Sequence, residues 1–302
     1  MRGEIRNAEE GSDLLRIGAD MKGKIGFALS FLPLLVLMAL GYVMPIASNI
    51  ASSMQDDAGS FVGLDNYARV LESYFFTDTL LFTIRTAVAS TAIAMVIAVV
   101  VALALRETFV GKKLVVFMFQ FNLTLPRMAA AMMVLLLVSQ TGLLSQISAA
   151  LGITQGPSSF PVLIHDEQGL GLICAFAWKF FPYIGMSVLG ILQGASREYE
   201  DQAAVLGVGR FKRFWHVTLP MIIPATSIAA IIVFAAAFGD FEMPMVLGSS
   251  SHRVLSTLTY LKYSDPTLMD KPASYVLMVV MSIVLIAIIL IYRHFTMGRR
   301  DK

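Results

Sequence analysis

Long uncharged runs alternate with short charged segments along the whole chain of 302 residues. Six runs have about the 20 apolar residues that a membrane-spanning helix needs. They are Ile25 to about Ala47, the stretch between Arg85 and Arg106, Leu114 to about Ser139, Leu170 to Leu192, Met221 to about Gly239, and Ala273 to Tyr292. Backbone polar groups in lipid must be satisfied within their own segment, so each run must be helical. The pattern therefore predicts an all-α integral membrane protein with six transmembrane helices.

The composition agrees with this class, because 57% of the residues are hydrophobic and only 15% are charged. A net charge of +2 gives no indication of nucleic-acid binding. The single cysteine, Cys174, lies within an apolar run and excludes a disulfide framework. The four histidines fall in separate segments without metal-ligand spacing, so no metal site is expected.

Lysine and arginine residues mark alternate ends of the spans and predict the orientation. They precede the first span, and they lie in the connection between the second and third spans, in the connection between the fourth and fifth, and at the end of the chain. The segment Ser48 to Thr79 instead holds five acidic residues against Arg69 alone. We therefore expect a cytoplasmic tail (1–24), a first span with the start of an outer loop (25–55), an extracytoplasmic loop (56–79), a five-span core (80–293) and a cytoplasmic tail (294–302).

The segment Gln193 to Pro224 is strongly charged and lies between two long apolar runs. Its first half has apolar residues at helical spacing and acidic residues on the other faces: Tyr199, Ala203 and Leu206, with Glu198, Glu200 and Asp201. Gly207 and Gly209 break this helix, and a second short helix begins near Phe211. The pattern predicts a helix-turn-helix hairpin over 194–220, outside the bilayer and suited to docking a soluble partner.

The hairpin resembles the cytoplasmic coupling loop of binding-protein-dependent ATP-binding-cassette importer permeases. That loop reads Glu-Ala-Ala, three residues, Gly, nine residues, then Ile-x-Leu-Pro. The frame falls here on Asp201-Gln202-Ala203, Gly207 and Val217-Thr218-Leu219-Pro220. Asp replaces Glu, Gln replaces the first Ala and Val replaces Ile.

The resemblance implies a type I importer fold in the bacterial inner membrane, and a set of partners. These are two ATP-binding subunits, a second and different permease subunit, and an extracytoplasmic substrate-binding protein. The solute would then pass by alternating access between the two permeases. The resemblance also implies that the residues coupling the chain to the ATPase are Glu198, Tyr199, Glu200, Asp201, Ala203, Leu206, Gly207, Leu219 and Pro220.

No phosphate-binding loop, nucleophile elbow or pair of histidine ligands occurs in the sequence, which predicts no catalytic residue and no bound cofactor. ATP and Mg²⁺ are accordingly expected on the partner ATPase. A self-contained secondary transporter is the competing interpretation, although the chain shows no matching halves.

Ionisable residues within apolar runs are candidates for the substrate path, because they are costly in a bilayer. Arg127 is expected near the middle of the third span and Lys179 in the fourth, while Asp240 and Glu242 close the fifth. Trp178 and Tyr183 are aromatic candidates beside them. The four charged residues are expected either to contact substrate or to neutralise one another.

The segment Phe238 to Gly248 resembles the equivalent part of polyamine, ferric iron and thiamine permeases. With the two acidic residues it favours a polyamine or similar organic cation as substrate. Iron, thiamine, a sugar or a phosphonate-type solute stay open as alternatives.

Two outer segments are candidates for docking the binding protein or for simple packing at the membrane surface. Phe61 to Tyr67 resembles a segment that recurs after the first span of such permeases. Gly142 to Gly152 has the apolar spacing of a helix that lies on the membrane.

Overall fold

The computed structural model describes residues 30–106 and 109–297. These residues form helices joined by loops, with an isolated antiparallel bridge between Gln55 and Phe61. The expected tail 1–24, the start of the first span and residues 298–302 lie outside the described residues. The helices in chain order are α2 (Leu32–Met38), the π-helix η1 (Ala39–Val43), α3 (Met44–Ser53), α4 (Asp65–Leu71), α5 (Tyr74–Arg106), α6 (Lys112–Thr124), α7 (Arg127–Val138), α8 (Leu143–Ala150), the 3₁₀-helix η2 (Pro157–Ser159), α9 (Leu170–Gln193), α10 (Ala195–Val205), α11 (Arg210–Arg213), the π-helix η3 (Phe214–Thr218), α12 (Leu219–Gly239), α13 (Glu242–Leu247), α14 (Leu255–Ser264) and α15 (Lys271–Met297).

Six helical stretches of the described chain are long and apolar enough to cross a membrane, which is the number that the sequence predicts. Five of them correspond to the expected spans, but the third runs from Arg127 to Ala150, through α7 and α8, where the sequence predicts Leu114 to Ser139. The second is longer than expected, because α5 begins at Tyr74 and runs for 33 residues. At 1.5 Å per residue it is about 50 Å long and exceeds a hydrocarbon layer of about 30 Å. The expected outer loop therefore contains α4 and the first turns of α5.

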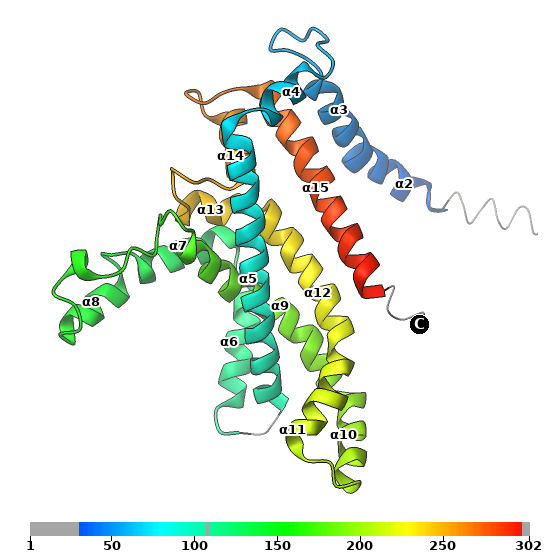
Figure 1. Cartoon of the computed structure of the whole chain (residues 1–302), viewed down its shortest axis with the longest axis vertical. Helices are drawn as coiled ribbons and strands as arrows, with labels where there is room; N and C mark the ends of the chain where they lie inside the picture. Colours follow the sequence, from blue (N-terminus) through cyan, green and yellow to red (C-terminus); the bar gives the residue numbers. More distant parts are fainter. Residues whose placement is uncertain (1–29, 107–108, 298–302) are drawn as a thin grey trace, which may run out of the picture.

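The stretch from Leu114 to Ser139 is not the single helix that the sequence predicts. It is divided into α6 and α7 by a break at Leu125 and Pro126, both of which have extended backbone conformations. Proline has no N–H to donate and disfavours a helical conformation in the residue before it, which accounts for the break. α6 packs against α9, whereas α7 packs against α13 and leads on to α8, which lies away from the centre of the molecule in Figure 1.

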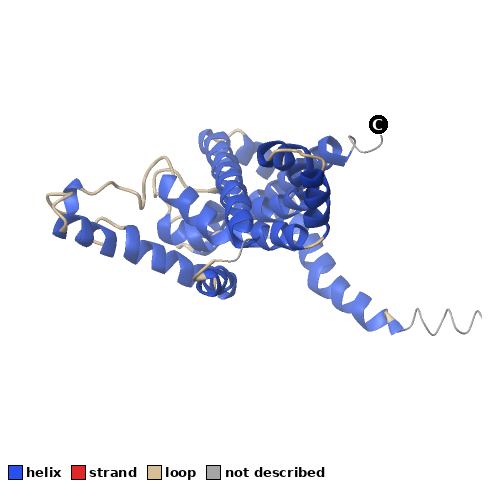
Figure 2. Cartoon of the chain, turned by 90° about the horizontal axis from the view of Figure 1, so that it is seen from below, coloured by secondary structure: helices blue, strands red, loops and turns tan. Residues whose placement is uncertain are grey.

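The core lies between α5, α9 and α12, which pack against one another. Ala87, Ala94, Ala98 and Ala102 are all at most 1% exposed and share one face of α5. Small side chains on that face allow α9 to approach closely. The view from below shows the helices gathered around this centre, with α2 and α3 leading outward (Figure 2).

A glycine near the start of α9 provides a test of how closely this helix packs against the loop that precedes it. A Cβ on Gly171 would lie 1.6 Å from the carbonyl oxygen of Leu163, a backbone atom in the preceding loop. Gly171→Ala should therefore lower the free energy of unfolding by about 1–3 kcal/mol, the cost of overpacking. Gly190→Ala is the control on the same helix, since nothing lies within 4 Å of its added methyl group. Thermal unfolding in detergent should separate the two variants, and equal melting temperatures would contradict the close packing.

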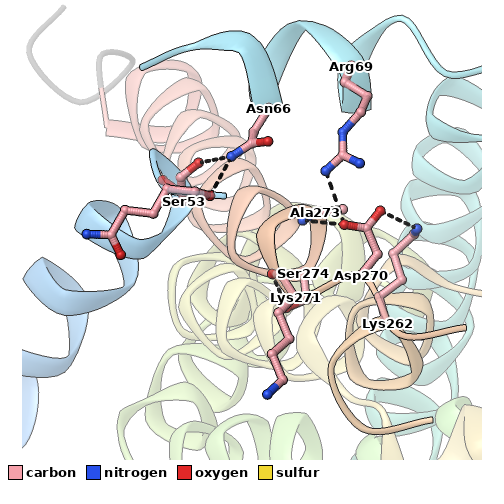
Figure 3. A network of polar contacts seen from close by, with 9 residues as sticks. Ser53, Asn66, Arg69, Lys262, Asp270, Lys271, Ala273 and Ser274 are labelled. Carbon is pink, nitrogen blue, oxygen red and sulfur yellow. Dashed lines mark hydrogen bonds and ion pairs between the residues drawn. The ribbon is translucent and has the colours of Figure 1, made fainter. Parts of the chain in front are cut away.

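The end of the bundle opposite the hairpin is joined by polar contacts between α3, α4 and α15 (Figure 3). Asn66 donates to the carbonyls of Ser53, at 3.1 Å, and Gln55, at 2.9 Å. Arg69 forms an ion pair of 3.1 Å with Asp270, the residue before α15. Within the segment Phe61 to Tyr67, Asn66 therefore packs inward, while Phe61 is 76% exposed.

Candidate functional site

The predicted hairpin is present at one end of the molecule (Figure 1). Gly194 separates α10 from α9, and the chain turns at Gly207, whose φ of +79° is a left-handed conformation that favours glycine. The second helix differs from the expectation. It does not stop before Pro220, because α11, η3 and α12 form one helical stretch from Arg210 to Gly239. The hairpin is therefore continuous with the fifth span.

Apolar side chains are exposed at the tip of the hairpin, where the resemblance to importer permeases predicts that the ATPase docks. Val205 is 89% exposed, Leu206 82% and Phe211 76%, and two aromatic residues on the helices of the hairpin, Tyr199 and Trp215, are half-exposed. We call these five residues the apolar tip. An exposed apolar patch beside charged residues is typical of a surface that binds another protein. Ala203 is half-buried instead.

Glu200 has a different environment from the other two acidic residues of α10. Its Oε2 lies 2.6 Å from Nη1 of Arg106, at the end of α5, and its Oε1 accepts a hydrogen bond from the Thr218 hydroxyl. The side chains of Arg106 and Glu200 are only 15% and 13% exposed. Glu200 is thus engaged within the chain in this structure, and its part in coupling to the ATPase stays a prediction.

Glu198 and Asp201, in contrast, are exposed. Sequence reasoning missed Arg106 and Thr218 as members of the site. The only signal for Arg106 in the sequence is its place as the first charged residue after the second apolar run.

Lys179 holds the broken third span rather than lining an open path. It is 1% exposed, and its Nζ donates to the carbonyls of Asn122, at 2.6 Å, and Leu125, at 2.8 Å. The Asn122 side chain in turn donates to the Trp178 carbonyl at 2.7 Å. The last carbonyls of a helix have no partner within the helix, and here Lys179 supplies one.

Glu242 holds the other side of the same break. Its Oε2 accepts a hydrogen bond of 3.1 Å from the N–H of Met128, in the first turn of α7. A carboxylate at a helix N-terminus is favoured by the helix dipole. Arg127 is therefore at the start of α7, and not near the middle of a span as expected.

Asp240 is 2% exposed, and its Oδ1 accepts the N–H of Glu242 at 2.9 Å. Arg127 acts on this carboxylate only at longer range. Among the ion pairs of the described residues, none joins Arg127 or Lys179 to Asp240 or Glu242. The expected alternative of a directly paired network is thus not formed. Trp178 and Tyr183 are 36% and 42% exposed on α9.

The sequence of residues 94–299, more than half of the chain, matches the family described as the inner membrane component of binding-protein-dependent transport systems. The chain belongs to this family. It is a permease subunit of an ATP-binding-cassette importer, a transporter component rather than an enzyme. This membership sets aside the alternative of a secondary transporter.

Several relatives of this permease align over most of their length. It is 23% identical to the trehalose/maltose permease MalF of Thermococcus litoralis, over 93% of this chain and 96% of the relative. It is 25% identical to the sn-glycerol-3-phosphate permease UgpA of Agrobacterium fabrum, over 77% and 81%. It is 26% identical to the sulfate permease CysT of Synechocystis, over 88% of both chains. These names do not support the expected likeness to polyamine, iron and thiamine permeases in particular.

The fold of the permease also matches a solved structure. A chain of a bacterial importer of the acidic polysaccharide alginate superposes with a TM-score of 0.79 at 18% identity, covering 94% of this permease and 99% of that chain. A second alginate transporter structure, in complex with a substrate-bound periplasmic protein, gives a TM-score of 0.76. These likenesses show the fold, including the six-span, all-α architecture.

Proposed function

We propose that this permease passes a sugar or a related hydroxylated or anionic solute from an extracytoplasmic binding protein to the cytoplasm. It would pair with a second permease in the bacterial inner membrane, with both termini cytoplasmic, and alternate access at the interface between them. ATP and Mg²⁺ would bind to two partner subunits that dock on the hairpin.

The hydrogen bonds and burial of Asp240 and Glu242 support this class of substrate over a cation. A polyamine or another organic cation would need carboxylates that are free to pair with it. Asp240 is buried against the Glu242 backbone, and Glu242 holds the start of α7. Neither carboxylate is therefore offered to a cation in this conformation.

The names of the relatives support the same choice. The permeases named above carry trehalose and maltose, glycerol phosphate or sulfate, and the structural neighbour imports alginate. These substrates are hydroxylated or anionic, and none is an organic cation.

Asp240→Asn separates the two substrate classes. Asparagine has the same shape and keeps one oxygen for the Glu242 N–H, while Asp240 Oδ2 has no hydrogen-bond partner in the described structure. We expect sugar uptake within about twofold of wild type, since this difference corresponds to less than 1 kcal/mol. The measurement is uptake into proteoliposomes that contain the whole transporter, with labelled sugars, glycerol phosphate and putrescine offered in turn.

Asp57→Asn, at an exposed acidic residue outside the spans, is the matched control for expression and assembly. If the wild-type transporter takes up putrescine well, and Asp240→Asn lowers that uptake tenfold or more, the substrate is a cation and the proposal is rejected.

A further inference from the structure

A cavity of about 400 Å³ lies at the end of the molecule opposite the hairpin, between α4, the start of α5, α14 and the start of α15. Apolar side chains form much of its wall, among them Phe75, Phe76, Leu258 and Leu277. Its lining includes none of the residues of the hairpin or of the break between α6 and α7.

The charged residues that line the cavity are three cations, Arg69, Arg253 and Lys262, and one acid, Asp270. Asp270 is shared, at 3.1 Å from Arg69 and 3.3 Å from Lys262. Its Oδ1 also accepts the N–H of Ala273 at 3.1 Å, which caps α15 (Figure 3). One carboxylate thus holds two cations in place, and the lining keeps an excess of positive charge.

Asp270 remains ionised in this arrangement. Burial alone would raise the pKa of Asp270, but the hydrogen bond from Ala273 and the charges of Lys262 and Arg69 outweigh burial and hold that pKa below its ordinary value.

Arg253 provides the excess charge. Its guanidinium has no hydrogen bond or ion pair within 4.0 Å among the described residues, and the exposed carboxylate of Asp265 acts on it only at longer range. A guanidinium presents five N–H donors in a planar fork that matches phosphate oxygens. The site therefore has donors available for an anion.

The cavity adjoins the start of the sixth span, because Ala273 and Leu277 in its wall belong to the first turns of α15. The first and sixth spans pack together, and the polar residues at their ends, Gln55 and Asp270, are joined through α4. Tyr74 and Phe75, at the start of α5, are 89% and 71% exposed. Exposed aromatic residues at the end of a span are typical of the headgroup region.

We propose that this cavity binds an anionic phospholipid, with its phosphate among Arg69, Arg253 and Lys262 and an acyl chain along Phe75 and Phe76. Free phosphate would satisfy the cations but leave the apolar wall uncovered. An acidic loop of a binding protein would pair with the cations, but the apolar wall and the adjoining start of the sixth span favour a ligand that comes from the bilayer. A phospholipid fits both the charge and the apolar surface.

The test uses the full chain, purified in detergent and stripped of lipid. Phosphatidylglycerol, phosphatidylcholine with the same acyl chains, and inorganic phosphate are added in turn, and binding is followed by native mass spectrometry and thermal unfolding. We expect phosphatidylglycerol to bind at least about fivefold more tightly than phosphatidylcholine, the size of one basic residue's attraction to an anionic lipid.

Arg253→Gln should remove most of this preference, because its side chain makes no contact that the fold needs. Lys271→Gln is the matched control, since the Lys271 side chain points away from Asp270 and Lys262 in Figure 3 and should leave the preference unchanged.

Three results would overturn the proposal. Equal affinity for the two lipids, or an Arg253→Gln variant with an undiminished preference, would show that the cations do not select the lipid. Stabilisation by inorganic phosphate equal to that by phosphatidylglycerol would assign the site to a soluble anion. Loss of stimulation by the binding protein in Arg253→Gln transporters, with the lipid preference intact, would assign the surface to protein docking.

Discussion

Leu206→Asp is expected to abolish binding of the ATP-binding subunits while the permease itself still folds. The Leu206 side chain is 82% exposed at the apolar tip, so its removal takes little from the packing of this chain. Burying a leucine in a partner's groove contributes about 1.5–3 kcal/mol, and a buried aspartate would add a desolvation cost. Copurification of the ATP-binding subunits, and the ATP hydrolysis that the binding protein stimulates, should both fall at least about 100-fold, since each 1.4 kcal/mol is tenfold.

The control for this variant is the same substitution at the other end of the molecule. Leu64 is 66% exposed beside α4, far from the hairpin in Figure 1, and Leu64→Asp should leave copurification of the ATP-binding subunits unchanged. A Leu206→Asp permease that still copurifies with them at wild-type levels would show that the apolar tip is not their docking surface.

The spans and the hairpin are predictable because their signals are local. Arg85 and Arg106 enclose an uncharged stretch of membrane-spanning length, and the structure forms α5 through it. Gly207 supplies the left-handed turn that two short helices need. Each of these features depends on residues within a few turns of one another, so the chain's own pattern is sufficient.

The break in the third span was only partly predictable. Pro126 indicates a disturbed helix. Whether a span bends or divides there depends on which side chains form hydrogen bonds with its unpaired carbonyls and N–H groups. Here Lys179 donates to the carbonyls from more than 50 residues away in the sequence, and Glu242 accepts an N–H from more than 110 residues away. In the sequence, the apolar residues around Lys179 and Glu242 suggest that these charges bind substrate. Only the tertiary structure shows that both residues stabilise the ends of the break between α6 and α7.

The three acidic residues of α10 show the same limit at the hairpin. Glu198, Glu200 and Asp201 are equivalent candidates by spacing, yet only Glu200 faces α5. Its partner Arg106 is 94 residues earlier in the chain. No local pattern relates two positions so far apart, and the pair depends on how α5 and α9 cross in the core.

Because it joins the hairpin to α5, the Glu200–Arg106 pair predicts a second large effect. Glu200→Ala leaves the Arg106 guanidinium and the Thr218 hydroxyl without their acceptor in a mostly buried place, at a cost of about 1–3 kcal/mol. We expect a loosened hairpin that is cut more readily in limited proteolysis, and solute uptake reduced about tenfold, which corresponds to 1.4 kcal/mol. Glu198→Ala, on the exposed side of α10, should leave the proteolysis unchanged.

Exchanging the two charges distinguishes a specific pair from a general loss of stability. In the double variant Glu200→Arg/Arg106→Glu the ion pair can form again in reverse, although Thr218 loses its acceptor, so protease resistance and uptake should recover in part. Each single reversal instead places two like charges together, and both should be worse than Glu200→Ala. If the double variant is as defective as the sum of the single reversals, the pair has no coupling energy. The hairpin would then have to be positioned by its links to α9 and α12 and by its other contacts, such as the packing of α10 on α9 and the hydrogen bond from Arg213 to the Glu200 carbonyl.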